Sequence, residues 1–345
     1  MDAQKKFGIG IVGTGMAVTP HVRALKDLGD TIAVRGVFSR NKANREAFAQ
    51  EHGFDAVESY EALLGDETID AILLLTPPNA RLELVKAAAK AGKHILMEKP
   101  VERTTAVATE IVEICEQAGV ISGVIFQFRF REGSLAAREL MESGKAGRLA
   151  SAALVVPWWR SADYYKEPGR GTFAQDGGGV LLTQAIHALD LMLSLTGQAA
   201  SVQAVAGTSI LHEIEVEDFV GAGLQFANGA LGSIMATTTA FPGDQEYLLL
   251  NCEKASLKLS GAVLSVNWHD GRVETIGKET TTGAGDDRMA FPHDWHRAQI
   301  ADFVAAVQSG GTPVSTGRTA LLAHRLIDAI LASSRDGVRV NVAQD

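Results

Sequence analysis

The stretch at residues 7–17, FGIGIVGTGMA, constrains the fold of this chain more than any other. An apolar run that includes Ile9, Ile11 and Val12 is interrupted by two glycines, and a helical pattern begins directly after them. This order predicts a buried strand, a tight turn and the start of a helix. Because the N–H groups at a helix start are unpaired and the helix dipole favours an anion, the stretch can hold a pyrophosphate against the glycine backbone.

Two registers of the dinucleotide fingerprint G-x-G-x-x-G fit this stretch. The literal match at Gly8, Gly10 and Gly13 would put the phosphate turn on side chains that have the pattern of a buried strand. We therefore place the turn after the strand, where Val18 occupies the third small position; a plain glycine-bearing turn is the alternative. The cofactor-binding residues predicted here are Gly13, Thr14, Gly15, Met16 and Ala17.

The composition argues against several classes of function. With 345 residues, 46% of them hydrophobic and 21% charged, the chain is long enough for two domains with a sizeable core. The formal net charge of −9 argues against nucleic acid or an anionic membrane surface as a partner, and no apolar run is long enough to span a bilayer. The polar first six residues and the two widely separated cysteines predict a cytoplasmic protein with free thiols and no metal site.

Strand and helix patterns alternate through the first part of the chain. Apolar strand patterns at residues 32–38, 69–75, 94–97 and 120–126 are separated by helical patterns. This alternation predicts a doubly wound parallel sheet, and we expect an α/β Rossmann domain that binds a dinucleotide over residues 1–124.

The end of the second predicted strand bears on the choice of cofactor. Ser39, Arg40, Asn41 and Lys42 follow this strand, and the first carboxylate after them belongs to Glu46. An acidic residue at this place would bind the 2′-hydroxyl of NAD, whereas Ser and Arg suit the 2′-phosphate of NADP. We therefore expect Ser39 and Arg40 to bind the cofactor, with NADP favoured over NAD. An arginine that stacks on the adenine of either cofactor is the alternative.

The third predicted strand ends in the sequence Thr76-Pro77-Pro78-Asn79. The prolines cannot continue the pairing of the strand, so the chain must turn at its carboxyl end. Ligands of open α/β sheets bind at this end of the strands. We therefore predict that Thr76, Pro77 and Asn79 contact the cofactor.

The pattern changes near residue 125, and we predict a second, α+β domain over residues 125–345 for substrate binding and oligomerisation. Alternating apolar and polar residues predict a large, mostly antiparallel open sheet with one buried face. The expected strands lie at residues 152–156, 202–206, 219–226, 230–238, 247–251, 256–259 and 263–268. Helical patterns follow at residues 295–308 and 318–333.

A loop at residues 157–179 combines many aromatic side chains with charged ones. Loops of this length inside a domain are usually functional or disordered, and this one is too aromatic for disorder. We predict a pocket for a sugar-like molecule, in which aromatic faces stack on a ring and charged groups bind hydroxyls. Aromatic residues that only cover the sheet edge are the alternative. The predicted substrate contacts are Arg160, Tyr165, Arg170 and Asp176.

A helix is predicted at residues 180–195, with Thr183, His187 and Asp190 on one face. The glycine run before it lets a ligand approach, so we expect Thr183 and His187 to contact the substrate; a structural histidine is the alternative. Gln184 is expected to give an amide contact to cofactor or substrate, and helix packing is the other interpretation of this side chain.

The sequence contains the motifs FGIGIVGTGMA, TPPN, AGKHILMEKP and the later DGGG with His187 and Asp190. Through these motifs the chain resembles the Gfo/Idh/MocA oxidoreductases over nearly its whole length. The resemblance implies that Lys99 lies at the nicotinamide and substrate and assists hydride transfer, and that the bond before Pro100 is cis. It also implies that His187 lies beside the substrate carbinol, and that the open face of the second sheet builds a homodimer or homotetramer. The further cofactor contacts that it implies are Glu98 and Gln127.

The sequence departs from the family pattern at several positions. Arg81 stands where relatives often have a histidine, Val18 replaces a small residue, and Phe128 replaces an asparagine beside the nicotinamide. Thr183 stands where many relatives carry an aspartate four residues before the histidine. One acid–base helper is therefore missing or replaced, and Asp176 or a bound water could serve instead.

We therefore predict an NAD(P)-dependent dehydrogenase or reductase that acts on a carbinol or carbonyl carbon of a sugar, cyclitol or related polyol. His187 would take the hydroxyl proton and Lys99 would stabilise the developing alkoxide, with the nicotinamide between these two side chains. The alternatives are the same fold acting on a dihydrodiol, an imine or a nucleotide-sugar, an enzyme that retains its cofactor while it cycles between two sugars, and a non-catalytic NAD(P)-binding sensor.

Overall fold

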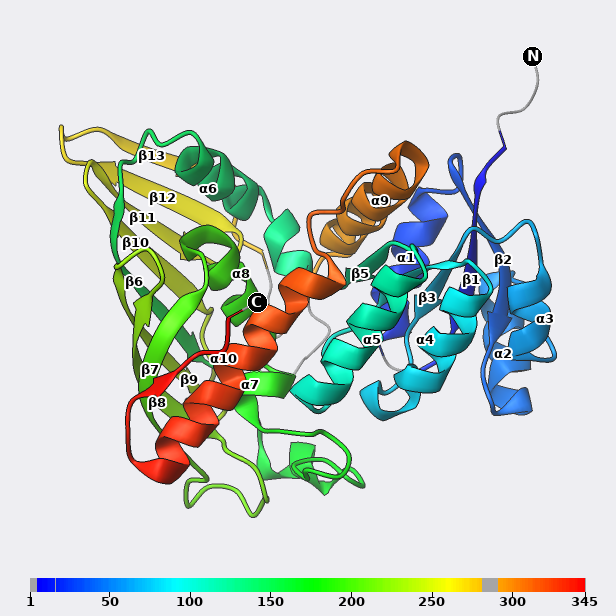
Figure 1. Cartoon of the computed structure of the whole chain (residues 1–345), viewed down its shortest axis with the longest axis horizontal. Coiled ribbons are helices and arrows are strands. Elements are labelled where there is room, and N and C mark those ends of the chain that lie inside the picture. The colour runs from blue at the N-terminus through cyan, green and yellow to red at the C-terminus, as the bar shows by residue number, and fades with distance from the viewer. Residues whose placement is uncertain (1–4, 16, 281–290, 345) are drawn as a thin grey trace. The chain divides into compact units, whose positions relative to one another are not determined.

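The computed structural model describes residues 5–15, 17–280 and 291–344. These residues form two compact units, which are drawn together in Figure 1. Unit 1 comprises residues 1–126 and 293–321, and unit 2 comprises residues 127–292 and 322–345. The domain boundary predicted at residue 124 stays a prediction, and residues 293–321 belong to unit 1.

Unit 1 contains a five-stranded sheet in the order β2-β1-β3-β4-β5, and all its neighbouring strands are parallel. The predicted doubly wound parallel sheet is therefore confirmed. Helices cover the sheet, and every residue of β1 is buried because an inner strand of such a sheet is covered on both faces. The strands are β1 (Phe7–Val12), β2 (Ile32–Phe38), β3 (Ala71–Leu74), β4 (His94–Met97) and β5 (Ser122–Val124).

The helices of unit 1 follow the strands in the expected alternation. They are α1 (Val18–Asp27), α2 (Lys42–His52), α3 (Tyr60–Gly65), α4 (Arg81–Lys90) and α5 (Thr105–Gln117), with the short 3-10 helix η1 (Pro78–Ala80) before α4. A sixth helix, α9 (Asp294–Ser309), packs on α1 although it lies far away in the sequence (Figure 1). Its residues Ile300, Phe303 and Val304 join the core of the sheet.

Unit 2 contains a nine-stranded sheet in the order β13-β12-β11-β10-β6-β9-β8-β7-β14. All neighbours are antiparallel except β6 and β9, which confirms the predicted, mostly antiparallel sheet. The strands are β6 (Leu149–Pro157), β7 (Ala199–Gly207), β8 (Phe219–Phe226), β9 (Leu231–Thr237), β10 (Tyr247–Cys252), β11 (Ala255–Ser260), β12 (Val263–Trp268), β13 (Val273–Ile276) and β14 (Val340–Asn341).

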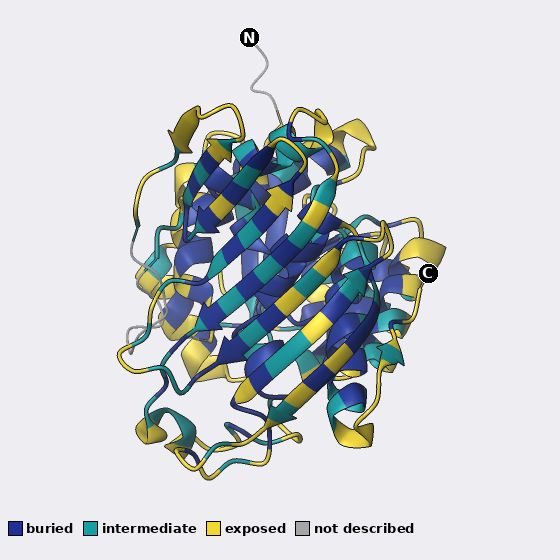
Figure 2. Ribbon diagram, turned by 90° about the vertical axis from the view of Figure 1, so that its left-hand side faces the viewer, coloured by how far each residue is buried: buried dark blue, intermediate teal, exposed yellow. Residues whose placement is uncertain are grey.

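One face of this sheet is covered by helices, and buried residues alternate with more exposed ones along its strands (Figure 2). Helix α8 (Ile186–Thr196) packs on β6, and α6 (Glu132–Glu142) packs on β11 and β12. The long helix α10 (Gly317–Asp336) begins in unit 1 and continues in unit 2. No helix in the described part of the chain has the length and apolar character that a membrane crossing requires.

The predicted helix at residues 180–195 is wrong in one respect, because it is broken into α7 (Val180–Thr183) and α8. The N–H of Ala185 bonds to the carbonyl of Val180, five residues back, at 2.7 Å. A hydrogen bond that spans five residues instead of four changes the angle at which side chains project before and after it. Thr183 and His187 therefore do not lie at i and i+4 of one continuous helix.

Candidate functional site

The glycine turn after β1 is built as the sequence predicts, and its two glycines have different surroundings. Gly13 has a φ of +105°, and a Cβ there would lie 2.8 Å from the carbonyl carbon of Leu75, so a larger residue does not fit. A Cβ on Gly15 would meet no atom within 4 Å. The start of α1 after Ala17 has no side-chain cap and no acidic residue in its first turn. The start of α1 is therefore uncapped, and a helix start of this kind can bind phosphate. Met16 lies outside the described residues.

The end of β2 lies next to this turn. The hydroxyl of Thr14 donates to the hydroxyl of Ser39 at 3.4 Å, and the guanidinium of Arg45 donates to the carbonyl of Ser39 at 2.8 Å. Arg40 is exposed. Two of the three predicted cofactor contacts in this region, Thr14 and Ser39, are thus brought into direct contact, with a buried arginine behind them.

The turn after β3 contains Thr76, Pro77 and Asn79. Pro77 directly precedes η1, and Asn79 is its second residue. The hydroxyl oxygen of Thr76 is buried and forms no hydrogen bond within the described residues. A buried hydroxyl without a partner costs free energy unless a ligand or water binds it. Thr76 therefore fits a group that contacts a bound molecule.

The turn after β4 holds Glu98, Lys99 and a cis Lys99–Pro100 bond, as expected. One carboxylate oxygen of Glu98 accepts the N–H of Lys99 at 3.0 Å, and the other accepts Nε2 of His21 at 2.7 Å. The ring of His296, on α9, packs edge-on against His21 with the centroids 4.8 Å apart. Lys99 thus lies in a turn in which both carboxylate oxygens of the preceding residue, Glu98, accept hydrogen bonds.

The charges of this cluster follow from its burial. Burial raises the pKa of Glu98, but the hydrogen bond from His21 and the nearby charges of His21, His296 and Lys99 lower it to about 2 in sum. Burial, together with the charge of His21, lowers the pKa of His296 to about 3. At neutral pH the cluster therefore contains an ionised carboxylate and a neutral imidazole.

His21, Glu98 and His296 offer ligand atoms within 4.8 Å of one another, a set that could hold a metal ion. The 2.7 Å hydrogen bond between His21 and Glu98 satisfies two of these groups directly. The sequence did not reveal this cluster, because its members lie on three elements that only the fold brings together.

In unit 2, His187 lies on α8 and its ring stacks on Phe128, with the centroids 5.0 Å apart and an interplanar angle of 28°. Phe128 belongs to the 3-10 helix η2 (Gln127–Phe130), and the guanidinium of Arg131 lies 3.3 Å from the centroid of the same phenyl ring. Arg131 in turn forms a buried ion pair with Glu246 at 2.5 Å. Phe128 therefore supports the ring of His187 on one face.

Two further predicted residues near η2 differ in their surroundings. Asp190 is bound in bidentate fashion by Arg129, with both distances 2.6 Å, and this pairing raises the pKa of Arg129 even though burial lowers it. The amide oxygen of Gln127 is buried and has no hydrogen-bond partner within the described residues. Gln127 is therefore the member of η2 that can accept a hydrogen bond from a ligand.

Part of the loop at residues 157–179 is organised around Tyr164, which the sequence prediction did not single out. Its hydroxyl accepts hydrogen bonds from Arg170 at 2.9 Å and from the amide of Gln184 at 3.2 Å. Thr183 donates to the amide oxygen of Gln184. The phenol of Tyr164 thus joins two predicted residues, Arg170 and Gln184, and Thr183 is joined to them through Gln184.

The other predicted residues of the loop are held by neighbouring backbone and side chains. Asp176 accepts the N–H of Gly171 at 2.7 Å, and the phenol of Tyr165 bonds to the hydroxyl of Thr238 at 3.0 Å. Arg160 is buried and donates to the carbonyl of Trp159 at 2.6 Å. The loop is therefore an ordered structure with its own 3-10 helix, η3 (Ala162–Lys166).

His212 fastens this loop to the sheet and was also missed. Its Nδ1 lies 2.8 Å from a carboxylate oxygen of Asp218, and its Nε2 lies 2.9 Å from the carbonyl of Arg160. Its ring also packs on Tyr165, with the centroids 4.7 Å apart. Only the fold pairs His212 with the loop, which lies about 50 residues earlier in the chain.

The third glycine of the DGGG run is required by close packing. A Cβ on Gly179 would lie 1.9 Å from the carbonyl oxygen of Glu217. The carboxylate of Glu217 accepts the N–H groups of Gly179 and Leu181 at 3.0 and 3.1 Å. The start of α7 is thus capped from the strand region before β8, and this fixes the segment that leads to His187.

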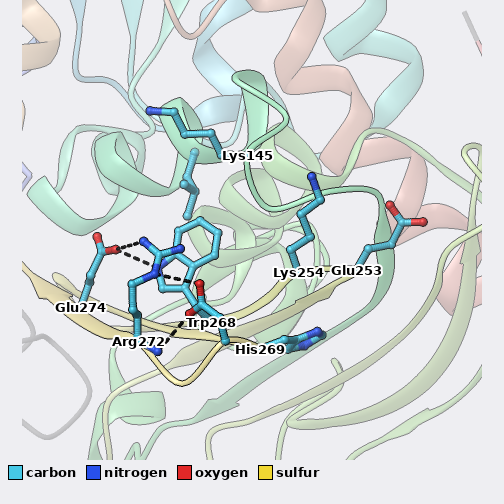
Figure 3. A pocket seen from close by; sticks show the side chains of 9 residues that line it. Lys145, Glu253, Lys254, Trp268, His269, Arg272 and Glu274 are labelled. Carbon is cyan, nitrogen blue, oxygen red and sulfur yellow. Dashed lines mark hydrogen bonds and ion pairs between the residues drawn. The ribbon is translucent and has the colours of Figure 1, made fainter.

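A separate pocket of about 720 Å³ lies at one end of the nine-stranded sheet (Figure 3). Its acidic side chains are paired, since Arg272 bonds to Asp270 and lies 3.8 Å from Glu274, and Arg148 bonds to Glu253. None of the predicted site residues lines it. This pocket is therefore not the predicted site.

Comparison with known proteins connects these features. Residues 7–126 match the model of the oxidoreductase family with an NAD-binding Rossmann fold, and residues 134–258 match the Gfo/Idh/MocA C-terminal domain. The chain is 27% identical to D-xylose 1-dehydrogenase (NADP(+)) 2 of Haloferax volcanii, over 97% of this chain and 99% of the relative. It is 25% identical to inositol 2-dehydrogenase of Rhizobium meliloti, over 97% and 98%.

Among solved structures, the WlbA dehydrogenase of Bordetella pertussis, in complex with NADH and UDP-GlcNAcA, is similar with a TM-score of 0.83. It is 27% identical, and the match covers 99% of this chain and 100% of the other. The glycine turn, the Lys99 turn and the two family matches all lead to one assignment: the chain belongs to the Gfo/Idh/MocA family and is an NAD(P)-dependent oxidoreductase.

Proposed function

We propose that this chain is a dehydrogenase or reductase that transfers a hydride between C4 of a nicotinamide and the carbinol or carbonyl carbon of a sugar, cyclitol or related polyol. The observation that carries the proposal is the turn after β4, in which an ionised, fully bonded Glu98 fixes the backbone at Lys99. The D-xylose and inositol dehydrogenases named above, which match nearly all of the chain, support a polyol substrate.

The residues at the carboxyl ends of β1 and β3 fit a dinucleotide. The space at Gly15, which a Cβ would enter without meeting another atom, and the uncapped start of α1 suit the pyrophosphate. The buried hydroxyl oxygen of Thr76 and the buried amide oxygen of Gln127 supply hydrogen-bonding groups that the described residues leave unpaired. When bound, the nicotinamide would supply the hydride acceptor or donor.

We propose NADP as the preferred cofactor. Ser39 lies beside the glycine turn, Arg40 is exposed next to it, and Arg45 supports the carbonyl of Ser39. The region contains no carboxylate until Glu46. An exposed guanidinium and a hydroxyl suit a 2′-phosphate, and the name of the Haloferax relative also contains NADP(+).

Lys99 and His187 are proposed to share the proton chemistry. The imidazole of His187 takes the hydroxyl proton during oxidation, because an imidazole titrates close to neutral pH. The ammonium of Lys99 donates a hydrogen bond to the same oxygen and stabilises its developing negative charge. In the reductive direction one of the two returns the proton. The stacked Phe128 holds the ring of His187 for this purpose.

A nucleotide-linked sugar is the second candidate substrate. The structure of the Bordetella WlbA dehydrogenase contains UDP-GlcNAcA, and it matches this chain over 99% of its length. The loop around Tyr164 contains two guanidinium groups, those of Arg160 and Arg170, within 5.6 and 4.6 Å of its ring. Cationic groups of this kind suit a diphosphate or a carboxylate.

The function is tested by calorimetric titration with NADP and NAD, followed by a substrate panel with the tighter cofactor. The panel contains pentoses, hexoses, inositols and UDP-linked sugars, with formation or loss of absorbance at 340 nm as the readout. We expect tighter binding of NADP and turnover of at least one free polyol. Turnover of only the UDP-linked sugars would select the second candidate. Binding of cofactor without turnover of any panel member would contradict the proposed substrate class.

A further inference from the structure

Arg81, the first residue of α4, is buried with only 1% of its surface exposed. Its guanidinium donates to backbone carbonyls of two different turns. Nε and Nη2 bond to the carbonyl of Thr76, in the turn after β3, at 3.2 and 2.8 Å. Nη1 bonds to the carbonyls of Glu98 and Pro100 and reaches that of Val101 at 3.4 Å.

The carbonyls that Arg81 binds flank Lys99 on both sides. Two N–H groups of the same turn are also bound, since the N–H of Glu98 donates to the carbonyl of Leu74 and the N–H of Lys99 donates to the side chain of Glu98. Arg81 is the side chain that holds the carbonyl side of the turn, and Glu98 is the side chain that holds its amide side.

A guanidinium is suited to this place for physical reasons. Its five N–H groups form a rigid planar fork that can satisfy several carbonyls at once, whereas a lysine has one nitrogen and a histidine has at most two N–H donors. Burial lowers the pKa of Arg81, and the charges of Glu98 and Glu102 offset part of this effect, which leaves a pKa of about 10. The group therefore keeps its charge and all its donors at neutral pH.

We propose that Arg81 is a positioning residue for Lys99, which ties the turns after β3 and β4 together and fixes the backbone from which the lysine side chain projects. The inference rests on the proposed role of Lys99. A side chain that acts only in this way influences turnover through Lys99, because a displacement of about 1 Å at a catalytic group can cost roughly 100-fold in rate.

The test compares Arg81→Lys with Arg81→Gln, each alone and combined with Lys99→Ala. We expect each single variant to lower kcat by about 10- to 100-fold, while the Kd for NADP changes by less than about fivefold. In the Lys99→Ala background the same substitutions are expected to lower kcat by less than about threefold, because the group that Arg81 positions is already absent. The matched control is Arg103→Lys. It makes the same chemical change two residues after the turn, in the partly exposed ion pair of Arg103 with Glu102.

A second readout does not depend on activity. Hydrogen–deuterium exchange of a peptide that covers residues 97–104 is expected to be faster by about tenfold or more in both Arg81 variants and unchanged in Arg103→Lys, because the amide of Lys99 lies in the loosened turn. If Lys99→Ala retains wild-type turnover, the proposed function fails, and exchange alone then decides whether Arg81 holds the turn.

Wild-type turnover and wild-type exchange in the Arg81 variants would overturn the inference. An equal loss of turnover with and without Lys99 would also overturn it, because Arg81 would then act on some other part of the protein. The glutamine variant keeps the test decisive if the lysine variant does not fold, since it removes the buried charge and retains two donors.

Discussion

Two glycines of the same turn illustrate how differently single residues depend on their surroundings. Gly13 has a positive φ and its α-carbon lies against the backbone of Leu75, whereas Gly15 faces open space. The first is required by the protein itself. The second is required only if a ligand occupies the space in front of it.

We therefore expect opposite phenotypes from Gly13→Ala and Gly15→Ala. Gly13→Ala should destabilise the fold by about 1–3 kcal/mol or more, because it combines backbone strain with a clash. Gly15→Ala should keep the melting temperature within about 2 °C, because its Cβ clashes with no atom of the protein. It should weaken NADP binding at least about tenfold. Thermal unfolding and calorimetric titration measure the two effects, and normal cofactor binding by Gly15→Ala would argue against a pyrophosphate at this turn.

The neutral His296 predicts a definite dependence of stability on pH. Its pKa in the folded protein, about 3, is lower than in the unfolded chain, so its contribution is fully present above about pH 6.5 and is lost as the pH falls toward 3. A difference of one bound proton between the unfolded and folded states changes the free energy of unfolding by at most about 1.4 kcal/mol per pH unit. Between pH 7 and pH 5 the wild type should lose up to about 2 kcal/mol more unfolding free energy than His296→Gln. Urea unfolding at both pH values measures this, and equal losses would show that His296 binds a proton in the folded protein as readily as in the unfolded chain.

Contiguous motifs made some residues of the site predictable from the sequence. The glycine turn and the E-K-P motif each contain their residues within a few positions, so the strand–turn–helix pattern pointed to Gly13 and the family resemblance pointed to Glu98 and Lys99. Arg81 was identified only as a departure from the family pattern, because nothing in a sequence shows which carbonyls a buried guanidinium reaches. His296 had no signal, since its partner Glu98 lies about 200 residues away.

At the scale of elements, periodicity predicted the strands of the parallel sheet and seven of the strands of the large sheet, because alternating or continuous apolar runs reflect burial directly. It missed β13, whose residues are mostly exposed, and the two-residue strand β14. It failed at the helix before His187. The break between α7 and α8 lies at the wide turn at Ala185, and the carboxylate of Glu217 caps the start of α7; helical spacing reveals neither feature. The order of strands, with β6 between β10 and β9, also follows from long-range pairing alone.

The packing of η2 on α8 leads to a prediction about Phe128. Its stack on His187 should hold the imidazole plane, an interaction of about 0.5–1.5 kcal/mol. Phe128→Leu is expected to lower kcat by roughly tenfold with little change in the Kd for NADP. Phe128→Tyr keeps the stack and should keep kcat within about threefold. Phe130→Leu makes the same change elsewhere in η2 and serves as the control; an equal effect of this control would show that the loss is merely structural.

At the scale of the whole molecule, one face of the large sheet carries exposed apolar residues. The strand register places Val205, Phe219 and Leu231 on the same face, and they are 71%, 40% and 62% exposed. Exposed apolar side chains on one face of a sheet favour association with another protein surface. We propose that this face joins copies of the chain in a homodimer or homotetramer.

Light scattering after size-exclusion chromatography tests this assembly. The wild type should elute as a dimer or tetramer, and the double variant Val205→Glu, Leu231→Glu should dissociate, because charges would be buried in the interface. Val338→Glu, at an exposed apolar residue outside this sheet, should leave the assembly unchanged. A monomeric wild type at micromolar concentration would contradict the proposal.

The proposed function depends most on Lys99, whose ammonium we propose to stabilise the oxygen of the reacting carbinol. The most direct measurement compares wild type and Lys99→Ala with the true substrate, using single-turnover absorbance at 340 nm together with calorimetric titration of NADP. We expect Lys99→Ala to lose turnover by about 10²- to 10⁴-fold, with cofactor affinity changed by no more than a few-fold. Wild-type turnover in Lys99→Ala would contradict it.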